Sequence, residues 1–140
     1  MTDSRRMLGV DIGEVRIGLA LSDPSGMICT PLTTLDANGA PHDQERIAEL
    51  ATEHEAVAIV VGLPINMDGS HGPAARRAQA FARMLRTLTS LPVMLHDERL
   101  TSHEAEARLR AAGVQPSRNK KQIDSAAAAL ILESYLAGQD

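Results

Sequence analysis

The chain has 140 residues, of which 44% are hydrophobic and 23% charged, with a net charge of −4, and this composition predicts one compact domain over residues 1–140. A single Cys excludes an internal disulfide, and the two aromatic residues give little support for base stacking on side chains. The absence of a signal-peptide pattern and of an apolar run near ~20 residues predicts a cytoplasmic protein with no membrane partner.

The first part of the chain carries the pattern of three β-strands joined by short turns. In "LGVDI" (8–12), apolar residues alternate with Gly9 and Asp11, and "RIGLALSD" (16–23) alternates in the same way. The segment "DPSG" has Pro second and Gly fourth, as many turns do, and a third strand follows in "MICTPLTTL" (27–35). We therefore predict an antiparallel meander in which Asp11 points away from the apolar side of its strand.

After this meander the pattern changes to alternating helices and strands. Apolar stripes at helical spacing predict helices, and short apolar runs predict strands covered on both faces. The predicted order is helix, strand, helix, strand and two final helices, over 41–54, 56–64, 73–90, 92–97, 101–113 and 118–138. Thr101 and Glu104 have capping-box spacing at the start of the first of the two final helices. The expected fold class is α/β, a five-stranded mixed sheet flanked by helices, antiparallel in the meander and parallel where helices cross over.

Acidic residues lie where open α/β sheets gather their active sites, at the ends of strands. Asp11 is in the first strand, Asp97 and Glu98 immediately follow the last strand, and Asp124 falls in the first turns of the final helix. Each has a structural explanation when taken alone, such as capping a turn or a helix. If they converge, binding of Mg²⁺ or Mn²⁺ explains them better, because hard divalent ions prefer carboxylates. Two such ions about 3.5–4 Å apart would support hydrolysis of a phosphodiester bond.

Four segments carry a resemblance to one family: "GVDIGEVRIGLALSD", "VVGLPINMDGSHGPAA", "DERLTS" and "IDSAAAALILESYL". In this order they resemble the signatures of the YqgF/RuvX family of pre-16S rRNA nucleases, which are similar to RuvC-type Holliday junction resolvases. The resemblance implies an RNase H-like fold and assigns catalysis and metal binding to Asp11, Glu98 and Asp124. Many RNase H-like nucleases carry the second acid on the strand after the first helix, but "AIVVGLP" offers none. Glu98 is therefore expected to reach the site from the next strand, with Asp97 as the alternative ligand.

The function implied by this resemblance is a metal-dependent endonuclease that processes the 5′ end of pre-16S rRNA during ribosome biogenesis. A resolvase of branched DNA is the alternative, because these residues do not distinguish RNA from DNA. Ribosome-assembly partners are expected, and the sequence agrees with either a monomer or a homodimer. Two other hypotheses stay open. Asp-Ile-Gly before a hairpin also begins the phosphate-binding segment of actin-like sugar kinases, and the fold could serve as a binding module without turnover.

The connection "GLPINMDGSHGP" joins a predicted buried strand to a helix. It lacks the Gly-Lys-Ser/Thr ending of a P-loop, so a nucleotide cradle of that type is not predicted. It is either an ordinary strand-to-helix connection or, as the resemblance favours, a contact to the nucleic-acid backbone at a helix N-terminus. The candidate contacts are Asn66, Asp68 and the backbone amides near Gly69, Ser70 and Gly72.

Positive charge is concentrated in one segment of the chain. Residues 69–121 carry ten Arg and Lys against four acids, whereas residues 1–68 carry four Arg against eleven acids. A charged segment is usually a solvated surface, but a basic loop just before Asp124 suits the entry of a phosphate chain. The candidate phosphate contacts are Arg76, Arg77, Arg99, Lys120 and Lys121. Contacts of this kind would carry no information about base sequence.

Overall fold

A five-stranded mixed sheet organises the computed structural model, which describes residues 4–98, 107–108, 110–113 and 120–138. Its strands are β1 (Met7–Ile12), β2 (Arg16–Ser22), β3 (Cys29–Asp36), β4 (Ala58–Leu63) and β5 (Val93–Asp97), in the order β3-β2-β1-β4-β5. β2 pairs antiparallel with β1 and β3, whereas β4 pairs parallel with β1 and β5. The predicted meander and the predicted mixed sheet are confirmed.

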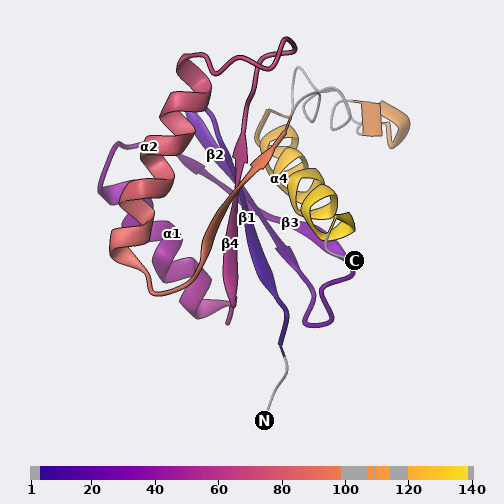
Figure 1. Cartoon of the computed structure of the whole chain (residues 1–140). Coiled ribbons are helices and arrows are strands. Elements are labelled where there is room, and N and C mark those ends of the chain that lie inside the picture. The colour runs from indigo at the N-terminus through magenta and orange to yellow at the C-terminus, as the bar shows by residue number, and fades with distance from the viewer. Residues whose placement is uncertain (1–3, 99–106, 109, 114–119, 139–140) are drawn as a thin grey trace.

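Helices cover both faces of the sheet (Figure 1). α1 (His42–Glu53) and α2 (Pro73–Leu88) lie on one face, and α4 (Lys120–Ala137) lies on the other. The predicted helix over 101–113 falls largely outside the described residues, as do Thr101 and Glu104, although residues 107–108 and 110–111 are helical. No helix in the described part of the chain is long and apolar enough to cross a membrane.

Two apolar layers form because successive residues of a strand point to opposite faces of the sheet. Leu8 and Val10 of β1 belong to the larger core beneath α1 and α2, together with Ile59 and Val61 of β4. Between them, Val60 points the other way and packs in the smaller layer beneath α4. β4 is therefore buried on both faces, as its unbroken apolar sequence predicts.

Glycines on β1 and β2 let α4 approach the sheet closely. A Cβ at Gly9 would lie 2.6 Å from Cγ of Leu132 and 2.9 Å from the carbonyl oxygen of Ala128. A Cβ at Gly18 would collide with the backbone of Asp124. Side chains at these two positions would push the helix away, so their absence fixes where the first turns of α4 lie over the sheet.

Candidate functional site

The side chains of Asp11 and Glu98 meet at one edge of the sheet. Because β1, β4 and β5 are parallel, their carboxyl ends lie together, with Asp11 near the end of β1 and Glu98 directly after β5. The amide of Glu98 donates a hydrogen bond to the carbonyl oxygen of Leu63 at 3.1 Å, which extends the pairing of β4 with β5. The carboxyl groups of Asp11 and Glu98 are hydrogen-bonded to each other. The structure therefore brings these two predicted residues into direct contact.

Gly62 of β4 makes room for the carboxyl group of Glu98. A Cβ on Gly62 would lie 2.8 Å from both Cδ and Oε2 of Glu98, and 2.6 Å from Cδ1 of Ile131 in α4. Both contacts are closer than ordinary van der Waals separation, so a larger residue would displace Glu98 from its place beside Asp11. The absence of a side chain at Gly62 thus allows Glu98 to lie beside Asp11.

Burial makes the charged forms of both carboxyl groups unfavourable. Removal from water raises the pKa of Asp11 to about 6 despite the lowering effect of its hydrogen bond with Glu98, and the negative charge of Asp124 adds to the rise. Removal from water also raises the pKa of Glu98 to about 9, with further contributions from the charges of Asp11 and Asp97. Near neutral pH the pair therefore retains a proton, which lies in the hydrogen bond between the two carboxyl groups.

Alternation along β5 distinguishes Glu98 from Asp97. Met94 packs in the apolar layer beneath α4, and His96, two residues later, hydrogen-bonds a serine of that helix at 2.8 Å. Glu98 continues this series and faces the same side of the sheet, whereas Asp97 falls at the alternate position. Of the two candidates, Glu98 is the residue whose side chain hydrogen-bonds Asp11.

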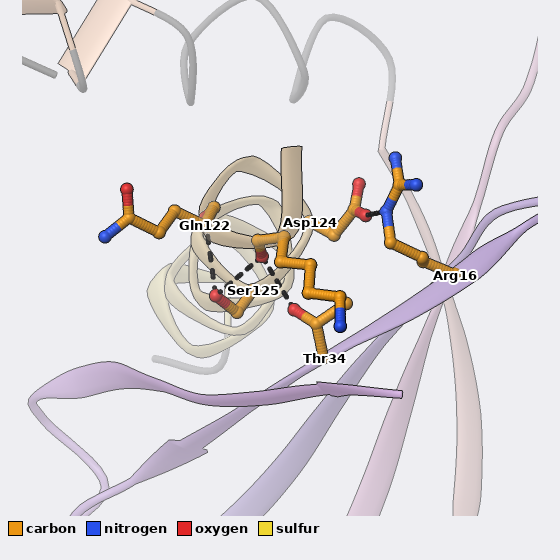
Figure 2. Close-up of polar contacts among 6 residues, drawn as sticks. Arg16, Thr34, Gln122, Asp124 and Ser125 are labelled. Atoms are coloured by element: carbon orange, nitrogen blue, oxygen red, sulfur yellow. Dashed lines mark hydrogen bonds and ion pairs between the residues drawn. The ribbon is translucent and has the colours of Figure 1, made fainter. Parts of the chain in front are cut away.

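Asp124 forms an ion pair with Arg16, as Figure 2 shows. Nε of Arg16 donates to Oδ2 of Asp124 at 2.7 Å, and the two side chains are 25% and 24% exposed. Arg16 opens β2 and lies two residues before Gly18, the glycine against which the backbone of Asp124 packs. Asp124 is therefore partly exposed to solvent. Its charge still acts on Asp11, whose pKa it raises.

The first turn of α4 is anchored to the edge strand β3 (Figure 2). The hydroxyl of Thr34 donates to the carbonyl oxygen of Lys121 at 2.6 Å. The hydroxyl of Ser125 donates to the carbonyl oxygens of Lys121 and Gln122, both at 3.3 Å. These bonds hold the helix start on which Asp124 lies.

The donor chemistry of the Asp11–Glu98 pair fits a divalent cation. Two partly buried carboxyl groups share a proton, and a cation would relieve the same repulsion between them. Carboxylate oxygens are the hard ligands that Mg²⁺ and Mn²⁺ prefer. Asp124 would join them only after separating from Arg16. Among the residues that the structure describes, no three His, Cys, Asp or Glu side chains are grouped to hold one ion. Two of the three predicted ligands, Asp11 and Glu98, are thus in contact, whereas Asp124 is paired with Arg16.

The loop between β4 and α2 is closed by its own hydrogen bonds. Asp68 accepts from the amide and the hydroxyl of Ser70, at 2.9 and 2.6 Å, and Nδ2 of Asn66 donates to the same hydroxyl at 3.0 Å. The amide of Gly69 donates to the carbonyl oxygen of Asn66 at 2.8 Å, and its φ of +89° suits glycine. The amides of Gly69 and Ser70 are therefore already paired, so a phosphate contact through them would require this loop to open.

The predicted basic contacts lie on different elements. Arg76 is exposed on α2, and the neighbouring Arg77 pairs with Glu14 of the β1–β2 hairpin at 3.4 Å. Lys120 and Lys121 are exposed at the start of α4, about one turn before the carboxylate of that helix. Arg99 lies outside the described residues. Among the described basic candidates, the two lysines therefore share a helix with a predicted acid, Asp124.

Two residues that shape the site were not predicted from the sequence. Arg16 binds Asp124, and its signal was the alternation of β2, which places it on the same face as Gly18. Gly18 pairs with Asp11 across the hairpin, so this face is also the face of the acid. Gly62 left a weaker signal, the one interruption of a β-branched and aliphatic run.

Comparison with known proteins places the chain among sequences that match along most of its length. The family model described as RuvX, Holliday junction resolvase, matches residues 5–138. A protein of Anaeromyxobacter dehalogenans (strain 2CP-C) named as a pre-16S rRNA nuclease is 49% identical over 131 residues, 94% of this chain and 96% of the relative. A protein of the same name from Chloroflexus aggregans (strain MD-66 / DSM 9485) is 45% identical over 134 residues, 96% of this chain and 94% of the relative.

Solved structures with the same arrangement of strands and helices include two resolvases. RuvC of Thermus thermophilus, in complex with a Holliday junction substrate, is similar with a TM-score of 0.58 and 14% identity, over 96% of this chain and 95% of that chain. The Holliday junction resolvase of fowlpox virus has a TM-score of 0.57 and 11% identity, over 94% and 97% of the two chains. At such identities the similarity shows the fold, and it confirms the expected RNase H-like architecture.

Proposed function

We propose a function from the family of the chain, which belongs to the RuvX family. The protein is a cytoplasmic nuclease that hydrolyses phosphodiester bonds in the precursor of 16S rRNA. Relatives that match over nearly their whole length are named for that activity. One observation carries the catalytic part of the proposal, which is the hydrogen-bonded and partly buried pair Asp11–Glu98 at the sheet edge. Two acids that are partly removed from water and adjacent to each other do not stabilise a fold. Groups with perturbed pKa values concentrate at functional sites.

Asp11 and Glu98 are the residues that would hold a Mg²⁺ or Mn²⁺ ion, in place of the proton that they share. A bound divalent ion supplies positive charge against the charge that develops on phosphoryl oxygens during hydrolysis. Asp124 is the third proposed ligand and the one on which a second ion would depend. For Asp124 to take this part, Arg16 must give up its 2.7 Å contact.

The basic residues beside the acids would hold the nucleic-acid backbone. Lys120 and Lys121 are exposed at the start of the helix that carries Asp124, where the amino end of the helix also favours an anion. Arg16, once separated from Asp124, would offer its guanidinium to a phosphate at the same place. In the reaction a water oxygen bonds to phosphorus, the ester P–O bond breaks, and the leaving oxygen takes up a proton.

A resolvase acting on branched DNA is the second candidate function. The description of the family favours it, and one structure of similar fold is bound to a Holliday junction substrate. It ranks below rRNA processing because the relatives that share nearly the whole length of this chain are named for the rRNA substrate.

A cleavage assay with both substrates tests the proposal. The protein is incubated with end-labelled precursor 16S rRNA and, separately, with a four-way DNA junction, each with Mg²⁺, with Mn²⁺ and with EDTA. We expect cleavage of the rRNA with a divalent ion and none with EDTA. Asp11→Asn and Glu98→Gln should each lower the rate by at least about 10²-fold, because they remove proposed ligands.

A matched variant makes this assay specific. Glu49→Gln changes an exposed carboxyl on α1, on the opposite face of the sheet from α4, and should leave the rate unchanged. Cleavage of the junction but not of the rRNA would favour the second candidate. Cleavage of either substrate that survives both Asp11→Asn and Glu98→Gln would refute the proposed site.

A further inference from the structure

The side chain of Arg16 binds Asp124 through one of its nitrogens. Nε donates to Oδ2 of Asp124 at 2.7 Å, and no hydrogen bond among the described residues uses the two terminal nitrogens (Figure 2). Within the described part of the chain, side-chain atoms that are buried without a partner occur at Arg6 and Gln44, so the terminal nitrogens of Arg16 are reached by solvent. A guanidinium presents its N–H groups in a planar fork that matches the oxygens of a phosphate.

The backbones on both sides of this contact are held in place. Arg16 is the first residue of β2, which pairs with β3. The backbone of Asp124 packs against Gly18, where a Cβ would collide with it, and the hydroxyl of Thr34 donates to the carbonyl oxygen of Lys121 at 2.6 Å. An exchange of partners at Asp124 therefore involves rotation of side chains, without movement of α4.

The carboxylate of Asp124 acts on the acidic pair from its place beside Arg16. Its negative charge is one cause of the raised pKa of Asp11, although burial is the larger cause. A cation beside Asp11 would therefore attract the carboxylate of Asp124. Arg16 opposes this attraction, because it holds an oxygen of Asp124 in a charge-assisted hydrogen bond.

Neither a divalent ion nor a phosphate alone gives every charge a partner. If an ion alone drew Asp124 away, the guanidinium of Arg16 would lose its partner and lie near a dication. If a phosphate alone took Arg16, the carboxylate of Asp124 would lose its partner and lie near a second anion. Separating one member of an ion pair costs free energy when the other charge stays uncompensated. With both ligands present, the phosphate binds Arg16 and the ion binds Asp124, so all the charges are paired.

We infer that Arg16 couples the binding of a nucleic-acid strand to the binding of a divalent ion. A backbone phosphate takes the guanidinium, the side chain of Asp124 turns to the ion, and each ligand raises the affinity for the other by the same factor. Before a strand binds, Arg16 keeps Asp124 from the ion. Arg16 is thus a positioning residue that acts on the metal site through Asp124. This coupling rests on the proposed function, which places the ion and the strand at this site.

Fluorescence anisotropy with a labelled single-stranded RNA measures the coupling without relying on cleavage. The dissociation constant of the RNA is determined in EDTA and in saturating Mn²⁺, on ice and at one ionic strength, and a denaturing gel verifies that the strand is intact. For the unchanged protein, we expect Mn²⁺ to tighten binding of the RNA about fivefold. This is the low end of couplings between two sites, because the exchanged ion pair is partly exposed to solvent.

Two arginine variants separate this exchange from a general effect of Mn²⁺ on RNA. Arg16→Gln removes the exchanged partner and should reduce the gain from Mn²⁺ to less than half of the gain in the unchanged protein. Arg46→Gln is the matched control and should keep the full gain. Arg46 also forms an ion pair, with Glu53 at 3.7 Å, but it lies on α1, on the opposite face of the sheet from α4.

A second comparison needs no metal. Asp124→Asn removes the charge that holds Arg16, so binding of the RNA in EDTA should tighten about fivefold. Loss of a negative charge near the strand would also tighten binding, whatever Arg16 does. The double variant Arg16→Gln/Asp124→Asn distinguishes the two causes, because the effect of Asp124→Asn should be lost when Arg16 is absent. Melting temperatures in EDTA verify that each variant is folded.

Two results overturn the coupling. One is a gain from Mn²⁺ in Arg16→Gln that is at least half of the gain in the unchanged protein. The other is tightening by Asp124→Asn that persists in the double variant. Absence of RNA binding in both EDTA and Mn²⁺ also refutes the coupling.

The cleavage assay judges the nuclease function separately. Cleavage of the rRNA by a protein whose coupling does not depend on Arg16 refutes the coupling and leaves the nuclease function standing. Coupling that depends on Arg16, without cleavage of the rRNA, refutes the nuclease function and leaves the coupling standing.

Discussion

Nε of Arg16 lies 2.7 Å from Oδ2 of Asp124, so the first residue of β2 holds the carboxylate that α4 brings to the site. The pair is only a quarter exposed but is still reached by solvent, so its contribution to stability is modest, at most about 1 kcal/mol. Its larger consequence concerns ligand binding, because an arginine and a divalent ion compete for the same oxygen.

Replacing this arginine should therefore increase the affinity for metal. We expect Arg16→Gln to bind Mn²⁺ more tightly than the unchanged protein in isothermal titration, and to lose about 1 kcal/mol or less of unfolding free energy. Arg77→Gln, which breaks the more exposed pair with Glu14, is the control and should leave Mn²⁺ affinity unchanged. Weaker Mn²⁺ binding by Arg16→Gln would show that the arginine supports the metal site instead of competing for it.

Without metal, the protein should lose stability as pH rises. In the unfolded chain Glu98 ionises near its ordinary pKa of 4.5, whereas in the folded protein it keeps its proton up to about pH 9. The folded state then binds more protons between these values, so the stability present below pH 4.5 is lost as pH rises toward 9. Asp11, with its pKa raised to about 6, adds to the loss at the acidic end of this window.

Urea unfolding in EDTA at pH 5.5, 7 and 8.5 measures this loss. One proton allows a slope of up to about 1.4 kcal/mol per pH unit. Glu98→Gln stays neutral at every pH and should flatten the curve, whereas Glu49→Gln should keep it. An unchanged slope in Glu98→Gln would contradict the burial of this carboxyl beside Asp11.

Divalent ions should stabilise the protein most at alkaline pH. Mn²⁺ competes with the proton of the Asp11–Glu98 pair, so its effect on the melting temperature should be larger at pH 8.5 than at pH 5.5. An ion present at a hundred times its dissociation constant stabilises the folded state by about 2.7 kcal/mol. Scanning calorimetry with Mn²⁺ or with EDTA checks this. Asp11→Asn should lose the shift, and a shift retained in full would place the ion elsewhere.

Gly18 of β2, which lies under the first turns of α4, should not tolerate a side chain. In Gly18→Ala the new Cβ meets the backbone of Asp124, so the helix start must move, at a cost of about 1–3 kcal/mol. Gly138→Ala is the matched control, because the nearest atom to its Cβ would be the carbonyl oxygen of Tyr135 at 3.6 Å, an ordinary contact. Equal unfolding free energies for Gly18→Ala and the unchanged protein would mean that α4 does not depend on this close approach.

The lysines at the start of α4 should contribute to the salt dependence of RNA binding. If Lys120 and Lys121 each neutralise one phosphate of a single strand, Lys120→Gln and Lys121→Gln should each reduce the slope of log K against log salt by about 0.7. Anisotropy titrations in EDTA at several salt concentrations measure the slope. Lys-to-Gln variants that weaken binding with an unchanged slope would show that these lysines act other than through phosphates.

Much of the fold was predictable because its elements depend on short-range pattern. Alternation in "LGVDI" placed Asp11 on the face away from the larger core, and the parallel order of the later strands brought Glu98 to the same edge. Both rules act along or between neighbouring strands. They therefore needed no knowledge of how the helices pack.

The rest depended on distances that no local pattern encodes. The contact of Arg16 with Asp124 requires that α4 cross β2 at Gly18, and this crossing follows from the packing of the whole helix. The room that Gly62 leaves for Glu98 is likewise a property of three-dimensional packing. The sequence showed that these residues were present but not what they would meet.

The order in which the elements leave the ribosome has a consequence for the proposed activity. Asp11 and Glu98 both precede α4 in the chain, whereas Asp124 and the cover of one sheet face are part of α4 itself. A nascent chain that stops before α4 would leave Val60 and its neighbours open to water and would lack a proposed ligand. The proposed site would therefore be complete only after α4 has docked on the sheet.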